Sequence, residues 1–158
     1  MTGGSEAPPV RVREAAPADL PAVHDLVAAA GLPLDGLDDA AHVLVAERAG
    51  GVVGVVALER HGNDGRPVFL LRSAAVDAAE RERGIGAALV SAALALVDEA
   101  RGEVALLTET AAGYFPRFGF AAVDRGALPA ALAASAELRG ACPASAHAFL
   151  RPITGSTP

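Results

Sequence analysis

The sequence predicts a mixed α/β sandwich, and two features of its element order support this class. Three apolar strand patterns follow one another over residues 42–48, 52–60 and 68–76, with turn residues between them. A long apolar helix pattern then runs from residue 84 to about residue 100, and strands and helices alternate after it. An opening run of strands differs from the regular alternation of a parallel sheet, so a mixed sheet is expected.

The remaining elements are predicted from periodicity and from the residues that start or stop them. Pro17 opens a helix that runs to about residue 30, because proline suits the first helical turn, and Gly31 ends it. The apolar strand over 68–76 is interrupted by Arg72 and Ser73 and is expected to be central in its sheet. The other expected elements are strands over 10–14, 104–109, 120–124 and 146–151, and helices over 35–41, 111–118 and 127–138.

Composition indicates one domain of ordinary size without a metal site. The 158 residues are 52% apolar, which is enough to build a core. We expect the domain to cover residues 10–152, between loose arms at 1–9 and 153–158. The single cysteine, Cys142, excludes an internal disulfide and a Cys-rich metal site, and the four histidines lack the spacing of metal ligands.

Charge and hydropathy exclude several classes of partner. The net charge of −6 argues against a general nucleic-acid binder, although an anionic cofactor could still bind locally. The longest apolar runs are too short to cross a bilayer, and the first residues show no secretory signal pattern. We therefore expect a cytoplasmic protein with no membrane partner.

A glycine-rich turn, Arg81-Glu82-Arg83-Gly84-Ile85-Gly86, joins the central strand to the long helix. A helix N-terminus exposes unpaired backbone N–H groups with partial positive charge, and glycines let a phosphate approach them closely. A dinucleotide fingerprint fails, because Leu89 stands where its third glycine would be. Two interpretations remain, namely a tight turn with only a structural role and a site for the pyrophosphate of coenzyme A.

With this turn in place, the chain resembles the GNAT superfamily of N-acetyltransferases. The family pattern is a strand, a loop and then Arg/Gln-x-x-Gly-x-Gly/Ala opening a helix, which here reads LLRSAAV at 70–76, DAAE at 77–80 and RERGIGAALV at 81–90. YFPRFGF at 114–120 is similar to the second signature, a short helix ending in Gly-Phe. The resemblance covers about residues 10–151. It implies an α/β (α+β) GNAT fold with a mixed central sheet of six to seven strands flanked by helices on both faces.

The resemblance implies acetyl-CoA as cosubstrate and no metal. Backbone groups of Ala74, Ala75 and Val76 would pair with the pantetheine arm as another strand does, and a backbone N–H there would polarise the thioester carbonyl. Backbone N–H groups of the turn would hold the pyrophosphate, with arginine charges beside them. The residues expected at the coenzyme after the strand are Arg81, Glu82, Arg83, Gly84, Ile85, Gly86 and Ala87.

Transfer to an amine needs a general base, and an acid can assist departure of the thiolate. Many family members place a tyrosine acid before Gly-Phe. The matching position here is Phe115, and Tyr114 precedes it, so Tyr114 is either the acid or a half-buried aromatic. Thr108 takes the place of the glutamate base that some members carry, with Glu109 beside it. Glu59 is a further candidate acting through a water, and each carboxylate has the alternative of an ordinary rim residue.

Arg72 stands inside an apolar strand, where an unpaired charge is costly. Either a carboxylate of the protein pairs with Arg72 or a substrate carboxylate does, and arginine suits two-pronged carboxylate binding. Substrate contact would place Arg72 and the adjacent Ser73 at the acceptor. We interpret Cys142 as a small residue in a C-terminal turn, because transfer in this family is direct and needs no acyl-enzyme.

A narrower resemblance concerns the acceptor. LLTETAAGYFPRFGF at 106–120 is similar to glutamate-type amino-acid N-acetyltransferases and to those of arsenic-resistance operons that acetylate arsinothricin, a glutamate analogue. LLRS at 70–73 and CPASA at 142–146 are similar to the latter group. Both groups imply a small-molecule amine with an α-amino acid head, such as glutamate or a phosphinothricin-like analogue. The alternatives are a different amine, a protein N-terminus, or a non-catalytic coenzyme A sensor, and a homodimer is left open.

Overall fold

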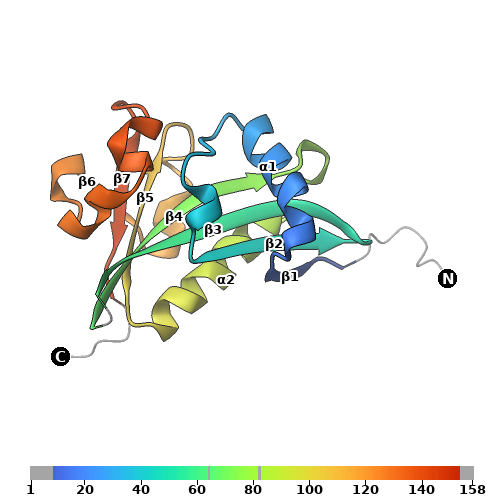
Figure 1. Cartoon of the computed structure of the whole chain (residues 1–158), viewed down its shortest axis with the longest axis horizontal. Helices are drawn as coiled ribbons and strands as arrows, with labels where there is room; N and C mark the ends of the chain where they lie inside the picture. Colours follow the sequence, from blue (N-terminus) through green and yellow to red (C-terminus); the bar gives the residue numbers. More distant parts are fainter. Residues whose placement is uncertain (1–8, 64, 82, 154–158) are drawn as a thin grey trace.

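The computed structural model describes residues 9–63, 65–81 and 83–153, and its strands form one sheet (Figure 1). Within these ranges the sheet has seven strands in the order β1-β2-β3-β4-β5-β7-β6, with β4 and β5 parallel and the other neighbours antiparallel. This mixed sheet confirms the predicted fold class. Glu82, residues 1–8 of the predicted N-terminal arm and residues 154–158 of the tail lie outside the described residues. The strands are β1 (Arg11–Glu14), β2 (His42–Arg48), β3 (Gly51–Asn63), β4 (Arg66–Val76), β5 (Glu103–Thr108), β6 (Ala121–Val123) and β7 (His147–Arg151).

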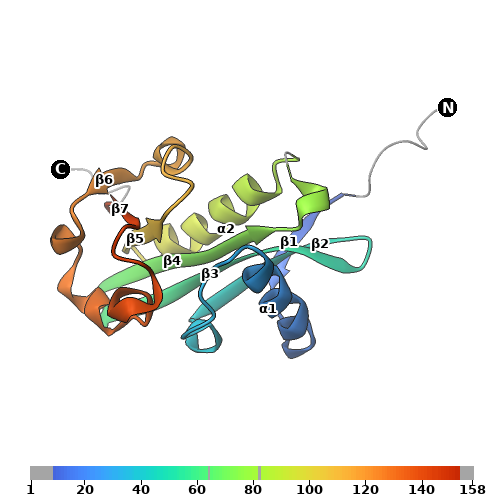
Figure 2. The same ribbon diagram turned by 90° about the horizontal axis from the view of Figure 1, so that it is seen from above.

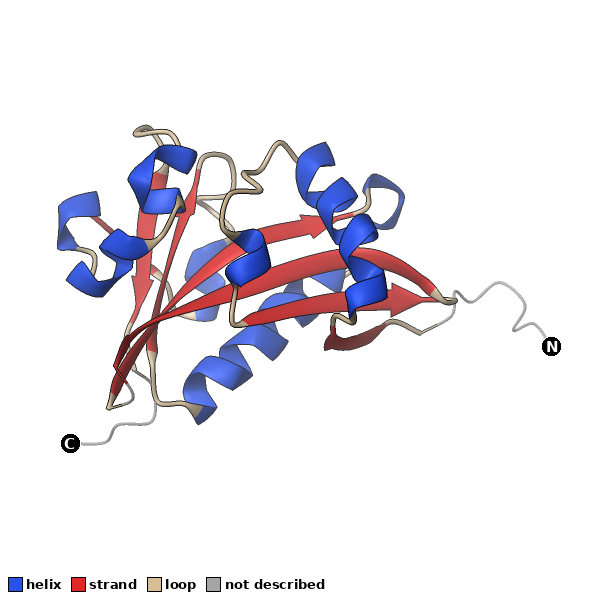
Figure 3. Cartoon of the chain, in the orientation of Figure 1, coloured by secondary structure: helices blue, strands red, loops and turns tan. Residues whose placement is uncertain are grey.

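Helices cover both faces of the sheet, as predicted. α1 (Leu20–Ala29) lies on one face and α2 (Ile85–Glu99) on the other (Figure 2). In the described ranges no helix is long and apolar enough to span a membrane. The remaining helical segments are short turns (Figure 3): η2 (Pro17–Asp19), η3 (Leu37–Asp39), η4 (Ala78–Glu80), η5 (Phe115–Phe118), η6 (Arg125–Ala127), η7 (Ala130–Ala134) and η8 (Glu137–Ala141).

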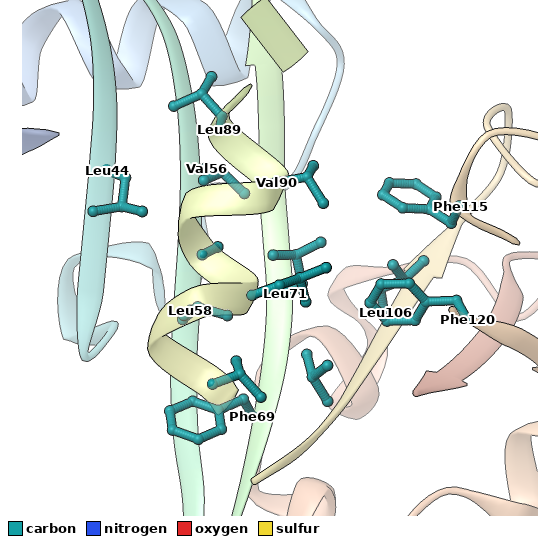
Figure 4. Close-up of a cluster of buried hydrophobic side chains, with 14 of the residues drawn as sticks. Leu44, Val56, Leu58, Phe69, Leu71, Leu89, Val90, Leu106, Phe115 and Phe120 are labelled. Atoms are coloured by element: carbon teal, nitrogen blue, oxygen red, sulfur yellow. The ribbon is translucent and has the colours of Figure 1, made fainter. Parts of the chain in front are cut away.

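Alternation along the strands divides the core between the two faces of the sheet. On β3, Val56 and Leu58 pack in the cluster that contains α2, whereas Val55 and Ala57 pack in the cluster that contains α1. The α2 cluster continues as far as Phe115 (Figure 4). Burial of one large apolar side chain contributes about 1.5–3 kcal/mol, so these contacts fix α2 firmly against the central strands.

The α-helix predicted over 127–138 is wrong. The chain instead forms η6, η7 and the π turn η8, and Gly140 adopts φ 117° inside η8. Alanine favours a helix, but Leu132 is fully buried in a cluster with apolar residues of β4 and β5, so packing of short turns overrides local propensity. The predicted helices over 111–118 and 35–41 shrink in the same way, to η5 and η3.

β4 and β5 run side by side at one end and separate toward the other (Figures 1 and 4). The register pairs Val68–Leu70 of β4 with Glu103–Ala105 of β5 and, within the described ranges, extends no further. β4 continues to Val76 along β3 alone. The edge of β4 beyond Leu70 therefore turns backbone N–H and C=O groups toward the gap between the strands.

β4 also carries a bulge just beyond the separation. Arg72 pairs with Ala57 of β3 and Ala75 pairs with Val55, so two β4 residues, Ser73 and Ala74, stand opposite one β3 residue. Ser73 has φ 60°, a left-handed conformation that is uncommon for a residue with a side chain. The bulge brings Arg72 and Ala75 to the same face of the sheet although they are three residues apart.

Gly102 allows β5 to begin close against β4. A Cβ atom at Gly102 would lie 2.6 Å from Phe69 Cε2 and 3.1 Å from the Pro67 carbonyl oxygen. Because Phe69 is buried, Gly102→Ala is expected to lower the free energy of unfolding by about 1–3 kcal/mol through overpacking. Urea denaturation measures this change. Gly126→Ala is the matched control, since a Cβ there meets nothing within 4 Å, and equal stability of the two variants would contradict this account of the β4–β5 junction.

Candidate functional site

Where β4 and β5 separate, the two strands form part of the wall of a cavity of about 790 Å³. The cavity is lined by the two strands, by the N-terminus of α2, by the loop that leads to η5 and by the loop after α1. Two groups of lining residues differ in chemistry. We call the first the helix end (Arg81, Gly84, Ile85, Gly86, Ala87, Tyr114 and Arg117) and the second the charged end (Leu32, Pro33, Arg72, Ser73, Glu137 and Cys142).

The helix end presents the backbone N–H groups that open α2. The first hydrogen bond of α2 runs from the Ala88 N–H to the Gly84 carbonyl (3.0 Å), so the N–H groups of Ile85, Gly86 and Ala87 precede the helical ladder. Gly84 caps the helix at φ 78°, a conformation that favours glycine. Donors at a helix N-terminus carry partial positive charge and suit a phosphate.

The two described arginines of the turn differ in position. Arg81 lines the cavity, and its Nε lies 3.3 Å from the Val76 carbonyl oxygen, to which it donates. Arg83 is exposed and is not among the lining residues. Glu82, predicted from the sequence to offer a backbone donor, lies outside the described residues. Arg81 is thus the turn arginine that the structure places at the cavity.

The end of β4 joins the two ends of the cavity. Ala74, Ala75 and Val76 all line it, and Ala74 is exposed although its neighbours in the strand are mostly buried. Because β5 has separated by this point, the β4 edge is open to an extended ligand that pairs with the strand. These three residues are the ones at which the sequence predicts the pantetheine arm.

The two adjacent aromatics both line the cavity, but Phe115 is buried in the core whereas Tyr114 is only partly buried. Phe115 is 6% exposed, and its ring meets Phe120 edge-on at 5.8 Å. The Tyr114 hydroxyl lies near α2, 3.6 Å from where a Cβ of Gly86 would be. The Arg117 guanidinium stacks on the Tyr114 ring at 4.4 Å, and its Nε donates to the Tyr114 carbonyl at 2.9 Å. The tyrosine therefore belongs to the helix end of the cavity.

The predicted candidates on β5 are only partly brought to the cavity. Thr108 lines it, and its Oγ1 accepts a hydrogen bond from the Ala111 N–H at 3.1 Å, which fixes the turn after β5. Glu109 is exposed and is not among the lining residues. In the described ranges no group of three or more His, Cys, Asp or Glu side chains is arranged to hold a metal ion.

Arg72 is the centre of the charged end, and its side chain is fully buried. Its Nη1 donates to Glu59 Oε2 and to the Asp35 carbonyl, both at 2.7 Å. Its Nη2 donates to the Pro33 carbonyl at 3.0 Å, and its Nε donates to Ser73 Oγ at 3.0 Å. A carboxylate of the protein therefore pairs with Arg72. Among the described contacts one Nη2 N–H is left for a ligand, which allows a single hydrogen bond and not a two-pronged grip.

A second buried carboxylate, Glu137 of η8, shares the same guanidinium. Its Oε2 lies 3.3 Å from Arg72 Nε, and its side chain is 4% exposed. Burial raises the pKa of Glu137 above its ordinary value, against the attraction of Arg72. Burial also acts to raise the pKa of Glu59, but hydrogen bonds from Arg72, His61 and Ser135 outweigh it, and the pKa of Glu59 is lowered. The two carboxylates thus differ in proton affinity.

Cys142 lines the cavity beside Glu137. Burial and the negative charge of Glu137 raise the pKa of the Cys142 thiol to about 12, so the thiol is neutral and donates a hydrogen bond to that carboxylate. A neutral thiol is a poor nucleophile. This agrees with the prediction that Cys142 has no acyl-enzyme role.

Glu137 was not among the residues predicted from the sequence. It lies in an alanine-rich segment whose pattern predicts a helix, where a single glutamate looks like an ordinary exposed charge. A signal existed in Arg72, since a buried guanidinium requires a buried carboxylate. The sequence alone does not identify which glutamates pair with Arg72.

The fold and the cavity together indicate an acetyltransferase. The sequence matches the Acetyltransferase (GNAT) domain over residues 39–122, which confirms the resemblance drawn from the glycine-rich turn. The chain belongs to the GNAT family of acetyltransferases. No curated protein matches the sequence significantly.

Solved structures of similar fold include several bound to coenzyme A. N-acetylglutamate synthase from Neisseria gonorrhoeae, complexed with coenzyme A and N-acetyl-glutamate, has a TM-score of 0.76 at 18% identity, and the similarity covers 94% of this chain and 36% of the synthase chain. Rv2747 from Mycobacterium tuberculosis, in complex with CoA and NLQ, has a TM-score of 0.73 at 25% identity over 90% of this chain and 99% of its own. A GNAT-family acetyltransferase from Staphylococcus aureus Mu50 has a TM-score of 0.73 at 16% identity, covering 92% and 99%.

We predict that Gly86→Asp weakens acetyl-CoA binding about tenfold or more while the protein stays folded. The new carboxylate would face the pyrophosphate, and like charges brought together cost several kcal/mol. The fold should survive, because a Cβ at Gly86 meets its nearest atom at 3.6 Å and an acidic residue suits the first turn of a helix. Isothermal titration calorimetry measures the affinity. Gly86→Ala controls for bulk, and undiminished binding by a folded Gly86→Asp protein would rule out this site for the pyrophosphate.

Proposed function

We propose that this chain transfers the acetyl group of acetyl-CoA to the primary amine of a small α-amino acid by direct attack of the amine. The observation that carries the proposal is that one continuous cavity extends from the α2 N-terminus to the buried charges around Arg72. The helix end would hold the pyrophosphate, the open edge of β4 would hold the pantetheine arm, and the thioester would lie near the bulge at Ser73 and Ala74. The acceptor would enter from the charged end.

The charges at the acceptor side suit an amino acid. An α-amino acid presents an ammonium group and a carboxylate close together. The charged end presents a carboxylate, Glu137, and the remaining Nη2 N–H of Arg72. Apolar and small residues of the loop after α1, such as Leu32 and Pro33, complete the wall and limit the acceptor to a small molecule.

The narrower resemblance of residues 106–120 supports glutamate or a related acceptor. The Neisseria synthase was solved with N-acetyl-glutamate, and this chain spans only 36% of that synthase, so glutamate is proposed here from the segment resemblance together with the charges. Arsinic and phosphinic analogues of glutamate, as in arsinothricin and phosphinothricin, keep the same α-amino acid head. They belong in the same acceptor screen.

We predict that wild-type enzyme prefers L-glutamate over 4-aminobutyrate, the same molecule without its α-carboxylate. One hydrogen bond to a charged group contributes about 1.5–3 kcal/mol, which corresponds to roughly a ten- to hundredfold difference in kcat/KM. Arg72→Lys is expected to shrink this ratio, because lysine cannot keep the geometry of the guanidinium. The KM for acetyl-CoA should change little. Release of free thiol measures turnover.

Arg151→Lys is the matched control for that experiment. Arg151 is also buried and ion-paired, with its Nη1 2.9 Å from Asp98 Oδ1, but it does not line the cavity. Its replacement should lower stability while leaving the acceptor ratio as in wild type. Equal kcat/KM for L-glutamate and 4-aminobutyrate in wild-type enzyme would contradict the α-amino acid proposal.

A further inference from the structure

The charged end contains one carboxylate that no feature of coenzyme binding uses. Among the described residues that line the cavity, the carboxylates are Glu80 and Glu137. Glu80 belongs to the turn before α2 and is ion-paired with Arg48 at 2.9 Å. Glu137 lies at the opposite side of the cavity, beside Arg72 and Cys142. A base for the acceptor amine is needed there, and neither Thr108 nor exposed Glu109 offers one.

The position of Glu137 is fixed by its surroundings. Its backbone N–H donates to Ser135 Oγ at 3.2 Å, and Ser135 is itself 2% exposed. The Cys142 thiol donates to its carboxylate, and Arg72 Nε lies at 3.3 Å. These contacts leave lone pairs of the carboxylate available to a group in the cavity, since a carboxylate accepts about four hydrogen bonds.

The two carboxylates on Arg72 have different roles in this geometry. Glu59 takes the short contact with Arg72 at 2.7 Å and a second one with His61 Nε2 at 2.8 Å, and it does not line the cavity. Glu137 takes the longer contact and lines the cavity. Glu59 is thus held by both Arg72 and His61, whereas Glu137 has only the longer contact with Arg72, so an ammonium group in the cavity would find Glu137 the less compensated carboxylate.

We propose that Glu137 is the general base, which receives the ammonium group of the acceptor and takes one proton from it. The proposal rests on the transferase activity of the family and does not depend on the acceptor being an amino acid. The environment pushes the proton affinities of Glu59 and Glu137 apart, which is the pattern expected where one carboxylate is structural and the other exchanges protons. Glu59 then acts as a positioning residue, because it holds Arg72 and so leaves Glu137 free to accept the proton.

The step balances as follows. The acceptor ammonium gives one proton to the Glu137 carboxylate and becomes a neutral amine. The nitrogen lone pair attacks the thioester carbon, the C–N bond forms, the C–S bond breaks, and its electron pair stays on sulfur. The nitrogen then gives up its second proton, which ends on the thiolate to form free coenzyme A. Glu137 returns its proton to water before the next turnover.

The test is the pH profile of Glu137→Gln, which keeps the size of the side chain and an oxygen for Arg72 and Cys142. With acetyl-CoA saturating and L-glutamate as acceptor, kcat at pH 7 should fall roughly 10²- to 10⁴-fold. In wild type, kcat/KM should rise with pH as Glu137 loses its proton, and because its pKa is raised this rise lies above the range of an ordinary glutamate. In Glu137→Gln this rise of kcat/KM with pH, the acidic limb of the profile, should vanish. The loss of rate relative to wild type should shrink as the pH approaches the pKa of the acceptor amine.

Two further glutamate variants distinguish the general base from a residue that only positions Arg72. Glu59→Gln removes the stronger partner of Arg72, so the positive charge falls more fully on Glu137 and the limb should move to lower pH without disappearing. Glu99→Gln changes an exposed residue at the end of α2 and should keep the wild-type profile. A Glu137→Gln protein that keeps the wild-type rate and limb overturns the proposal.

A direct titration makes the result independent of any acceptor. In protein labelled with ¹³C at glutamate Cδ, the signal missing from Glu137→Gln identifies Glu137, and it should titrate above about 4.3, the ordinary value for glutamate. A midpoint at or below that value overturns the base assignment. If wild type leaves L-glutamate unmodified, the acceptor proposal fails separately. The pH profile is then measured with the fastest primary amine of the acceptor screen.

Discussion

The parallel pairing of β4 with β5 stops at Leu70, and the site depends on the consequences of that stop. Backbone donors and acceptors need partners, and in the described structure the β4 edge from Leu71 to Val76 has no neighbouring strand on this side. The same separation leaves room for a cavity and exposes it to the N-terminus of α2. One departure from regular sheet pairing thus supplies both an edge that an extended coenzyme arm can pair with and the space that holds it.

A buried guanidinium organises the other side of the cavity. Because the Arg72 side chain is buried, the protein satisfies most of its donors, and the partners come from the loop after α1, from β3 and from η8. Three segments far apart in the chain are thereby drawn to one point. The bulge at Ser73 and Ala74 lies within the open edge of β4, next to Arg72, so the acceptor wall and the coenzyme wall are built from one strand.

Local patterns predicted the fold well and placed the glycine-rich turn at the start of α2, because strand alternation, helix starts and glycine-rich turns are short-range features. The sequence also marked Arg72 as unusual. It did not identify Glu137, because that residue reaches the cavity through turns that form only by packing Leu132 against β4 and β5. Nor did it decide between Tyr114 and Phe115, since a 3-10 turn and core packing set which ring is buried.

Hydrogen–deuterium exchange with and without saturating acetyl-CoA tests the central role of the separated strands most directly. The account predicts that peptides covering residues 71–76 and 85–87 become protected when the coenzyme binds, because their free N–H groups acquire partners. Peptides covering residues 68–70, which are paired on both sides, should change little. Binding of acetyl-CoA without protection at residues 71–76 would contradict the account.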